Sequence, residues 1–135
     1  MERRMVAGVA AKTLLLALLV PVVAAAHGKV IVGTYSSLSY NKESDDLNGI
    51  EISLVPVEGG LSASVQVAED GVNEVHLAEV AKKSDVFIFS IRMDDGSVID
   101  FSMACTLARC RGEYEWRNGK VPFILPKSIG YWNGR

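Results

Sequence analysis

Short runs of alternating apolar and polar residues fill most of the sequence after residue 48, and this period-two pattern is what most constrains the fold. In the run 110–117, Cys110, Gly112, Tyr114 and Trp116 share one face, and charged residues occupy the alternate positions. Such alternation indicates a β-strand with one buried face. Because turn-forming residues separate the runs, the pattern predicts an all-β fold. We expect an antiparallel meander of about eight strands that closes into a small barrel or sandwich.

We expect the strands over residues 29–35, 49–56, 61–68, 75–80, 86–91, 97–105, 110–117 and 121–125. The segment 75–81 also fits a short helix, because its alternation is irregular, but its neighbours favour a strand. Glu58-Gly59-Gly60, Asp94-Asp95-Gly96 and Asn118-Gly119 are signals for tight turns between strands. The segment 36–48 is rich in Ser, Asn and acidic residues and is expected to form the one long loop.

The first 26 residues follow a different pattern, which is that of a secretory signal peptide. Arg3, Arg4 and Lys12 supply positive charge, and an apolar run of small and branched residues follows from 13 to 26. Ala24 and Ala26 supply the small residues of a cleavage site ahead of His27. The run is shorter than the roughly 20 residues that a membrane-spanning helix needs. We therefore expect residues 1–26 to be a cleaved signal peptide and residues 27–135 to be a single β domain in the periplasm or secreted.

The charge of the expected mature chain excludes some classes of partner. Residues 27–135 carry 11 basic and 15 acidic residues, a net charge of −4. Binding to phosphate backbones requires a basic surface, so nucleic acid is not an expected partner. The expected mature chain has no second long apolar run, so we expect no membrane span in it.

The two cysteines are expected to form a disulfide. Four residues separate Cys105 from Cys110, and the alternation places both side chains on the apolar face. A hairpin loop of that length would set them opposite each other, and an exported protein meets an oxidising compartment. Redox catalysis is the alternative, but the spacing differs from the C-x-x-C pattern that such enzymes use.

No catalytic or metal-binding motif stands out, and no catalytic residue, metal ligand or cofactor is assigned. The acidic segment 41–51 lacks the spacing of a calcium loop, so we interpret it as a solvated loop. His27, as a new N-terminus, could hold a transition metal, although a flexible terminus is the favoured interpretation. His76 is the one histidine in the body of the domain and the residue on which a hydrolase would depend.

Tyr131 and Trp132 are expected to close the end of the barrel, the alternative being that they line a ligand pocket.

Three segments carry a resemblance to known proteins. They are Glu43-Ser44-Asp45-Asp46 through Gly49-Ile50-Glu51, then Gly112-Glu113-Tyr114 through Gly119, and then Tyr131-Trp132. In these the chain resembles a group of small, uncharacterised exported proteins of Gram-negative bacteria with β-barrel-like folds. The cysteine pair is not part of that group's pattern. The resemblance implies an exported β domain and implies no activity. The expected architecture is also similar to that of small lipocalin-like barrels.

Two functional hypotheses follow from the sequence. The first is a non-catalytic periplasmic binding or interaction protein, whose ligand is a small apolar molecule in the barrel mouth or another envelope protein, such as a hydrolase that it inhibits. The second is a small periplasmic hydrolase that uses His76 with an acidic partner. The first is favoured, because alternation places most polar side chains on the faces assigned to solvent rather than in a convergent site.

Overall fold

The computed structural model of the chain describes residues 31–69 and 74–134. The expected signal peptide, together with His27, lies outside the described residues. The described elements are, in chain order, β1 (Gly33–Ser36), β2 (Ser39–Asn41), β3 (Asp46–Val57), β4 (Gly60–Ala68), β5 (Val75–Lys83), β6 (Val86–Arg92), β7 (Val98–Cys105), β8 (Arg109–Trp116), β9 (Gly119–Ser128) and a short 3₁₀ helix, η1 (Tyr131–Gly134).

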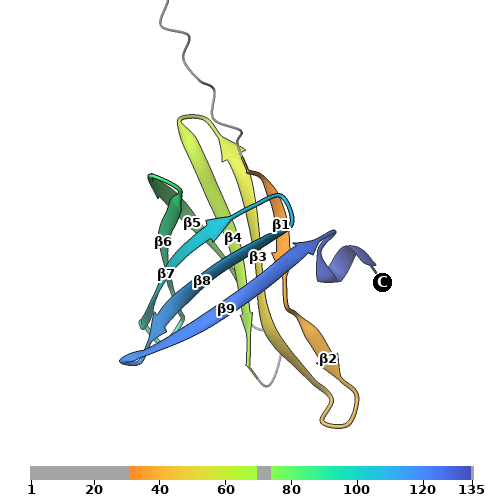
Figure 1. Cartoon of the computed structure of the whole chain (residues 1–135). Helices are drawn as coiled ribbons and strands as arrows, with labels where there is room; N and C mark the ends of the chain where they lie inside the picture. Colours follow the sequence, from red (N-terminus) through yellow and green to blue (C-terminus); the bar gives the residue numbers. More distant parts are fainter. Residues whose placement is uncertain (1–30, 70–73, 135) are drawn as a thin grey trace, which may run out of the picture.

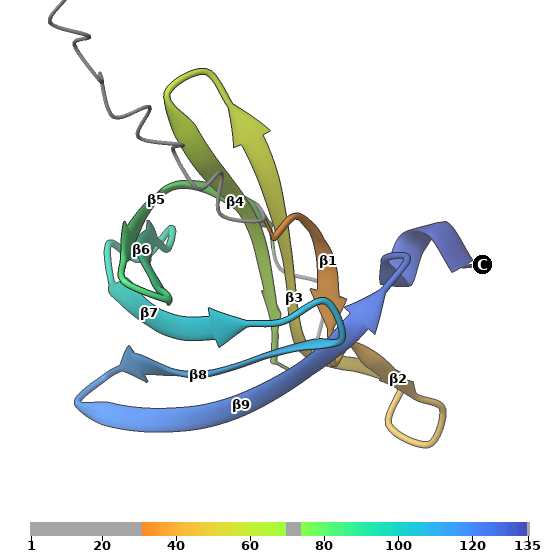
Figure 2. The same cartoon turned by 45° about the horizontal axis from the view of Figure 1, so that its top comes forward.

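The strands form an antiparallel up-and-down meander that closes into a barrel (Figures 1 and 2). From β3 to β9 each strand pairs with the next one in the sequence, and β1 pairs with both β3 and β9. Eight strands therefore make the barrel, as the alternation predicts, and β2 extends it as a ninth strand on β3 alone. Segment 75–81 belongs to a strand and not to a helix.

The expected long loop at 36–48 is wrong, because this segment contains β2 and forms a hairpin with the first residues of β3. Both faces of β2 are exposed, so it carries no apolar signal that would mark it in the sequence. Polar contacts shape its turn instead: the Asn41 side chain accepts a hydrogen bond from the Glu43 backbone N–H, and the Tyr40 hydroxyl bonds to the Asp45 carboxylate. Asp45 also adopts a left-handed φ of 61°, which Asp tolerates better than most residues.

A bulge between β1 and β2 separates the barrel from this extension. The backbone N–H of Ser37 donates to the Ile50 carbonyl at 2.8 Å, and its hydroxyl accepts from the Ile50 N–H at 3.1 Å. Gly49 faces the bulge with a φ of 119°, and a Cβ there would lie 2.5 Å from the Ser37 carbonyl oxygen. Only glycine fits this position, so Gly49 fixes where the barrel wall ends and the β2 extension begins.

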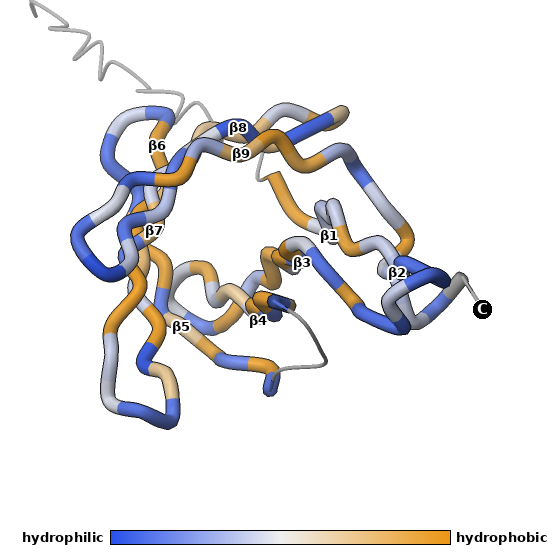
Figure 3. The backbone as a smooth tube through the Cα atoms, turned by 90° about the horizontal axis from the view of Figure 1, so that it is seen from below, coloured by the Kyte–Doolittle hydropathy of each residue, from blue (hydrophilic) through white to orange (hydrophobic). Residues whose placement is uncertain are grey.

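The apolar faces of the strands fill the barrel interior. Among the side chains that alternation directs inward, Cys105 and Trp116 are partly buried and pack against the core. The fully buried ones include Ile50, Ile52, Leu54, Val65, Val67, Ile99, Phe101, Tyr114 and Phe123. Figure 3, viewed along the barrel from below, shows the strands as a ring. At its centre the Phe101 ring stacks on that of Phe89 at 4.9 Å and lies 5.7 Å from that of Tyr114.

Tyr131 and Trp132 do not close an end of the barrel, which corrects the expectation. They lie in η1, which packs on the outer surface of β3 and β4 beyond the end of β9 (Figure 1). The Tyr131 backbone N–H donates to Glu51 Oε2 at 2.7 Å, and Trp132 Nε1 donates to Gln66 Oε1 at 2.9 Å. Glu51 and Gln66 are outward positions, so the polar face of the barrel, and not its apolar interior, receives the aromatic pair.

Candidate functional site

The barrel has two differently built ends. We call one the Gly59 end, formed by the turns at 58–59, 84–85 and 106–108 and by residues 31–32. We call the other the Asn118 end, formed by the turns at 42–45, 94–96 and 117–118 and by residues 69 and 74 beside the β4–β5 connection. The buried interior side chains, including Tyr35, Phe89 and Phe101, lie between them.

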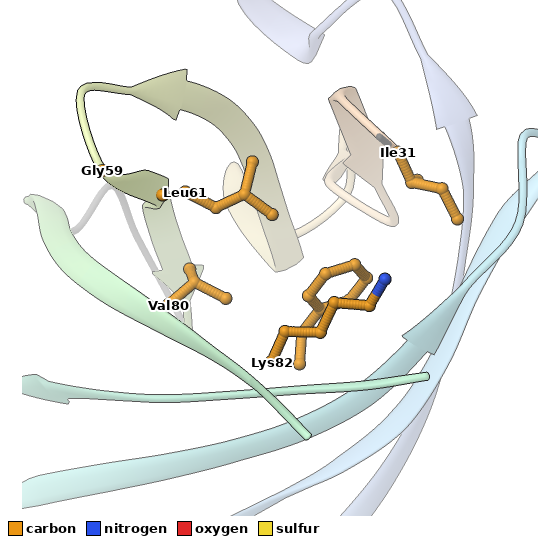
Figure 4. Close-up of a pocket in the computed structure, with 7 residues that line it drawn as sticks. Ile31, Gly59, Leu61, Val80 and Lys82 are labelled. Atoms are coloured by element: carbon orange, nitrogen blue, oxygen red, sulfur yellow. The ribbon is translucent and has the colours of Figure 1, made fainter. Parts of the chain in front are cut away.

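At the Gly59 end, a cavity of about 370 Å³ opens between apolar side chains. Leu61 and Val80 lie on paired positions of β4 and β5, and Phe87 is the second residue of β6. Figure 4 shows Leu61, Val80 and Lys82 directed into one space, with Ile31 facing them from the opposite side. Leu61, Val80 and Phe87 come from the consecutive paired strands β4, β5 and β6. Ile31, which precedes β1, reaches them because the barrel closes.

The hairpin turn at 58–59 forms the rim of this cavity. Val57 pairs with Gly60, which leaves Glu58 and Gly59 as a two-residue turn, as the sequence predicts. Gly59 has a φ of 85°, and no atom lies within 4 Å of where its Cβ would stand. The turn is therefore not covered by other parts of the chain that the structure describes, and the cavity beside it is open to solvent. A second hollow on the other side of the same hairpin includes the carboxylates Glu58 and Glu79.

A disulfide and a buried hydroxyl anchor the opposite rim of the Gly59 end. Cys105 and Cys110 are paired residues of β7 and β8, and their sulfur atoms are at bonding distance, as the spacing predicts. The Tyr35 side chain is fully buried, and its hydroxyl donates to the Thr106 carbonyl in the same turn at 2.9 Å. Burial raises the pKa of the Tyr35 hydroxyl, so the proton that makes this bond is retained.

The Asn118 end holds a polar hollow of similar size, about 370 Å³. His76 points inward from β5 and lines this hollow together with Glu74, Asp94, Asp95, Met93, Trp116 and Arg117. Arg117 lies over the Trp116 ring, 4.6 Å from its centroid, and 3.8 Å from an Asp95 oxygen. Trp116 Nε1 is buried without a hydrogen-bond partner among the described residues.

The structure thus brings His76 close to acidic residues, which the sequence alone does not reveal. No Ser, Thr or Cys is among the described residues that line this hollow. Within residues 31–69 and 74–134, no group of three or more His, Cys, Asp or Glu side chains is arranged to hold a metal ion. A hydrolytic reaction here would therefore have to activate a water molecule directly, with His76 or a carboxylate as the base.

The turn at the Asn118 end is displaced by one residue from its sequence signal. Trp116 pairs with Gly119, so Arg117 and Asn118 are the two turn residues, with φ values of 50° and 67°. Two consecutive left-handed residues characterise the type I′ turn that joins twisted antiparallel strands. The shift matters for the site, because it puts Arg117 at the tip of the turn, where its guanidinium covers Trp116 and meets Asp95.

The outer face of β5 also carries exposed apolar side chains. Leu77 is 78% exposed and Val75 is 56% exposed, and both point away from the barrel interior. In the part of the chain that the structure describes, no helix has the length and apolar character to cross a lipid bilayer.

Comparisons with known protein families and known structures do not identify the protein. No protein-family model, no curated protein and no solved structure matches the chain significantly. What can be inferred about function therefore comes from the two ends of the barrel.

Proposed function

We propose that this protein is an exported, non-catalytic binding protein that takes a small apolar molecule into the cavity at the Gly59 end. The observation that carries the proposal is the convergence of Ile31, Leu61, Val80 and Phe87 on one cavity that is open to solvent. Ligand sites are concave, mostly apolar and roughly 300–1,000 Å³ in volume, and the mouth of a barrel is a common place for them. The cavity lies near the lower limit of that range, so the ligand is small.

The walls of the cavity are suited to binding rather than to chemistry. Phe87 is 3% exposed, and its ring is held in place by the interior of the barrel. Among the described residues that line the cavity, Lys82 carries the one ionisable side chain. A nucleophile and a base in contact would be needed for covalent catalysis, and these residues do not offer such a pair.

Export is proposed on two grounds. Residues 1–26 have the charge and hydropathy pattern of a signal peptide. The Cys105–Cys110 disulfide is a bond that persists in oxidising compartments and is rare in the cytosol. Protein recovered from the periplasm of an expressing cell should have the intact mass of a chain that begins at His27. A mass that retains Met1 would contradict export with cleavage.

Binding is tested with a neutral fluorescent probe, N-phenyl-1-naphthylamine, whose emission rises in apolar surroundings. The parent protein should bind it, and Val80→Phe should weaken binding at least tenfold, because the larger ring fills the cavity. Val75→Phe is the matched control, since Val75 lies on the same strand but points outward. It should bind as the parent does. Circular dichroism checks that both variants are folded, and equal binding by both would refute the site.

The second hypothesis, a hydrolase that uses His76, is favoured by one observation, the placement of His76 beside Glu74, Asp94 and Asp95. It predicts turnover of ester or amide substrates that disappears in His76→Ala by roughly a hundredfold or more, the scale of a lost general base. The binding proposal predicts that any measured biological effect stays within a few-fold of the parent in that variant.

A further inference from the structure

The cavity at the Gly59 end has a basic side chain at its rim. Residues His76, Ala78, Val80 and Lys82 are the successive inward positions of β5, so Lys82 is the last inward residue before the turn to β6. Its aliphatic stem forms part of the cavity wall, and its Nζ lies 5.8 Å from the centroid of the Phe87 ring. Figure 4 shows the side chain extending across the open space toward Ile31. Lysine stems commonly cover apolar surface in this way while the charge stays in water.

The Lys82 ammonium has no carboxylate partner among the described residues, whereas two other lysines are engaged. Lys120 pairs with Glu113 at 2.9 Å, and Lys127 donates to the Val32 carbonyl at 2.6 Å. A neutral ligand that filled the cavity would displace water from around the Lys82 charge without replacing its hydrogen bonds, which costs free energy. A ligand with a negative group at the rim would replace them with a charge-assisted bond.

The wider charge distribution favours an anion at this end. Among described residues near the Gly59 end, four are basic and three are acidic: Lys82, Lys83, Arg109 and Lys127 against Glu58, Glu79 and Asp85. Near the Asn118 end, four are basic and eight acidic: Lys42, Arg92, Arg117 and Lys120 against Glu43, Asp45, Asp46, Glu69, Glu74, Asp94, Asp95 and Glu115. The summed field therefore drives anions toward the Gly59 end and away from the other.

A buried layer of side chains lies below the cavity and limits how far the apolar part of the ligand can enter. The next interior layer consists of Leu54, Ala63, Ala78 and Phe89, each no more than 8% exposed. An apolar chain that enters the cavity beside Leu61 and Val80 therefore stops against this layer and cannot pass through the barrel. A chain that fills a cavity of about 370 Å³ and leaves its polar group at the rim matches the position of Lys82.

Resting on the function proposed above, we propose that the ligand is a short amphiphile with an anionic head group, and that Lys82 is the residue that selects the head group. The apolar chain occupies the cavity, and a carboxylate or a comparable anion pairs with Lys82 Nζ at the rim. The ion pair is partly exposed, so its effect on affinity is modest, and the chain contributes most of the binding.

Three ligands with the same ten-carbon chain separate the two contributions: decanoate, 1-decanol and decyltrimethylammonium. Each is titrated against the protein loaded with N-phenyl-1-naphthylamine, and displacement is measured at low and at high salt. Decanoate should bind about three- to fivefold more tightly than decanol, as expected for a partly exposed ion pair. The cationic ligand should bind no better than decanol. High salt should reduce the preference for decanoate and leave decanol unchanged.

Lys82→Met should abolish the difference between decanoate and decanol while the affinity for decanol stays within twofold. Lys82→Arg should restore the difference. Lys83→Met is the matched control, because Lys83 follows on the same strand and points outward. This variant should retain the preference for decanoate.

Equal binding of decanoate and decanol by the parent would overturn the role of Lys82 and leave apolar binding intact. If neither ligand nor the probe binds, the proposed function fails, and the inference fails with it. If Lys82→Met weakens both ligands equally, Lys82 acts by packing and not by charge, which also overturns the proposal.

Discussion

The two ends of the barrel use the same architecture for opposite surface chemistry. The cavity at the Gly59 end gathers apolar side chains and the Lys82 ammonium, whereas the hollow at the Asn118 end gathers a histidine, carboxylates and an arginine. Both hollows have similar volumes, so size does not distinguish them. The difference lies in which residues occupy the first and last inward positions of the strands. Alternation sets the interior of such a barrel, and the residues at the strand ends set what each mouth can bind.

The largest effect should come from removing the aromatic centre that separates the ends. Phe101 is almost completely buried and lies against Phe89, Tyr114 and Phe123. Phe101→Ala should lower the free energy of unfolding by about 3–5 kcal/mol, as expected for a large-to-small change in a core. Urea denaturation measures this. Ile124→Ala, on the outer face of β9, is the control and should change stability by less than about 0.5 kcal/mol.

The next effect concerns the disulfide, which anchors a turn at the Gly59 end and has no counterpart among the described turns of the Asn118 end. Reduction should lower the free energy of unfolding by about 2 kcal/mol, because the closed loop is short. Urea denaturation with and without dithiothreitol measures it. The double variant Cys105→Ala/Cys110→Ala should be insensitive to the reductant. A parent protein equally insensitive to it, with two free thiols under denaturing conditions, would contradict the bond.

A smaller effect should appear in the titration of the Asn118 end. Hydrogen bonds from the Ser97 side chain and backbone lower the pKa of the Asp95 carboxyl, and Arg117 adds to this. These contacts favour the carboxylate, so their contribution to stability is present above the unfolded-state pKa of about 3.9. It is lost as the pH falls through the lower pKa of the folded protein. Ser97→Ala should raise the pKa of Asp95 in an NMR titration, and an unchanged pKa would show that Ser97 is not the cause.

The smallest expected effect is the sharpest test that the two ends are independent. His76→Ala should leave the binding of N-phenyl-1-naphthylamine within twofold of the parent, because buried layers lie between His76 and the cavity. Conversely, Val80→Phe should leave the NMR titration of Asp95 unchanged. Loss of probe binding in a folded His76→Ala variant would place the binding site at the Asn118 end.

The parts of the fold that follow from the sequence are those that alternation determines. Inward and outward faces, the meander and the cysteine pair all follow from period two and short turns, because a buried face is encoded residue by residue. The β2 hairpin has no buried face and is built from side chain–backbone bonds, so its sequence reads as a loop. For Tyr131 and Trp132 the sequence predicts burial at the end of the barrel, and this is wrong. Their hydrogen-bond partners, Glu51 and Gln66, are outward residues far away in the sequence, which no local pattern indicates.

The candidate site is less predictable than the fold. Leu61, Val80 and Lys82 can each be assigned to an inward face from the sequence. Their convergence with Ile31 depends on barrel closure and on strand register, which no local pattern contains. Lys82 in particular looks like one of two ordinary surface lysines before a turn. The sequence does contain one indication. Lys82 lies two positions after Val80, so alternation directs it inward, whereas Lys83 is directed outward.

The seam of the barrel also bears on how the chain folds. Strand β1 meets β9 through only two residue pairs, Thr34 with Ser128 and Tyr35 with Lys127, although these segments lie at opposite ends of the domain. A contact between segments so far apart in the sequence has a large entropic cost of loop closure. We therefore expect it to form late, after the local hairpins from β3 to β9 have formed. Until β9 pairs with β1, Tyr35 lacks part of its surroundings and the barrel is an open sheet with two unpaired edges. Pairing of the last strand with β1 is therefore the step that converts an aggregation-prone open sheet into a closed barrel.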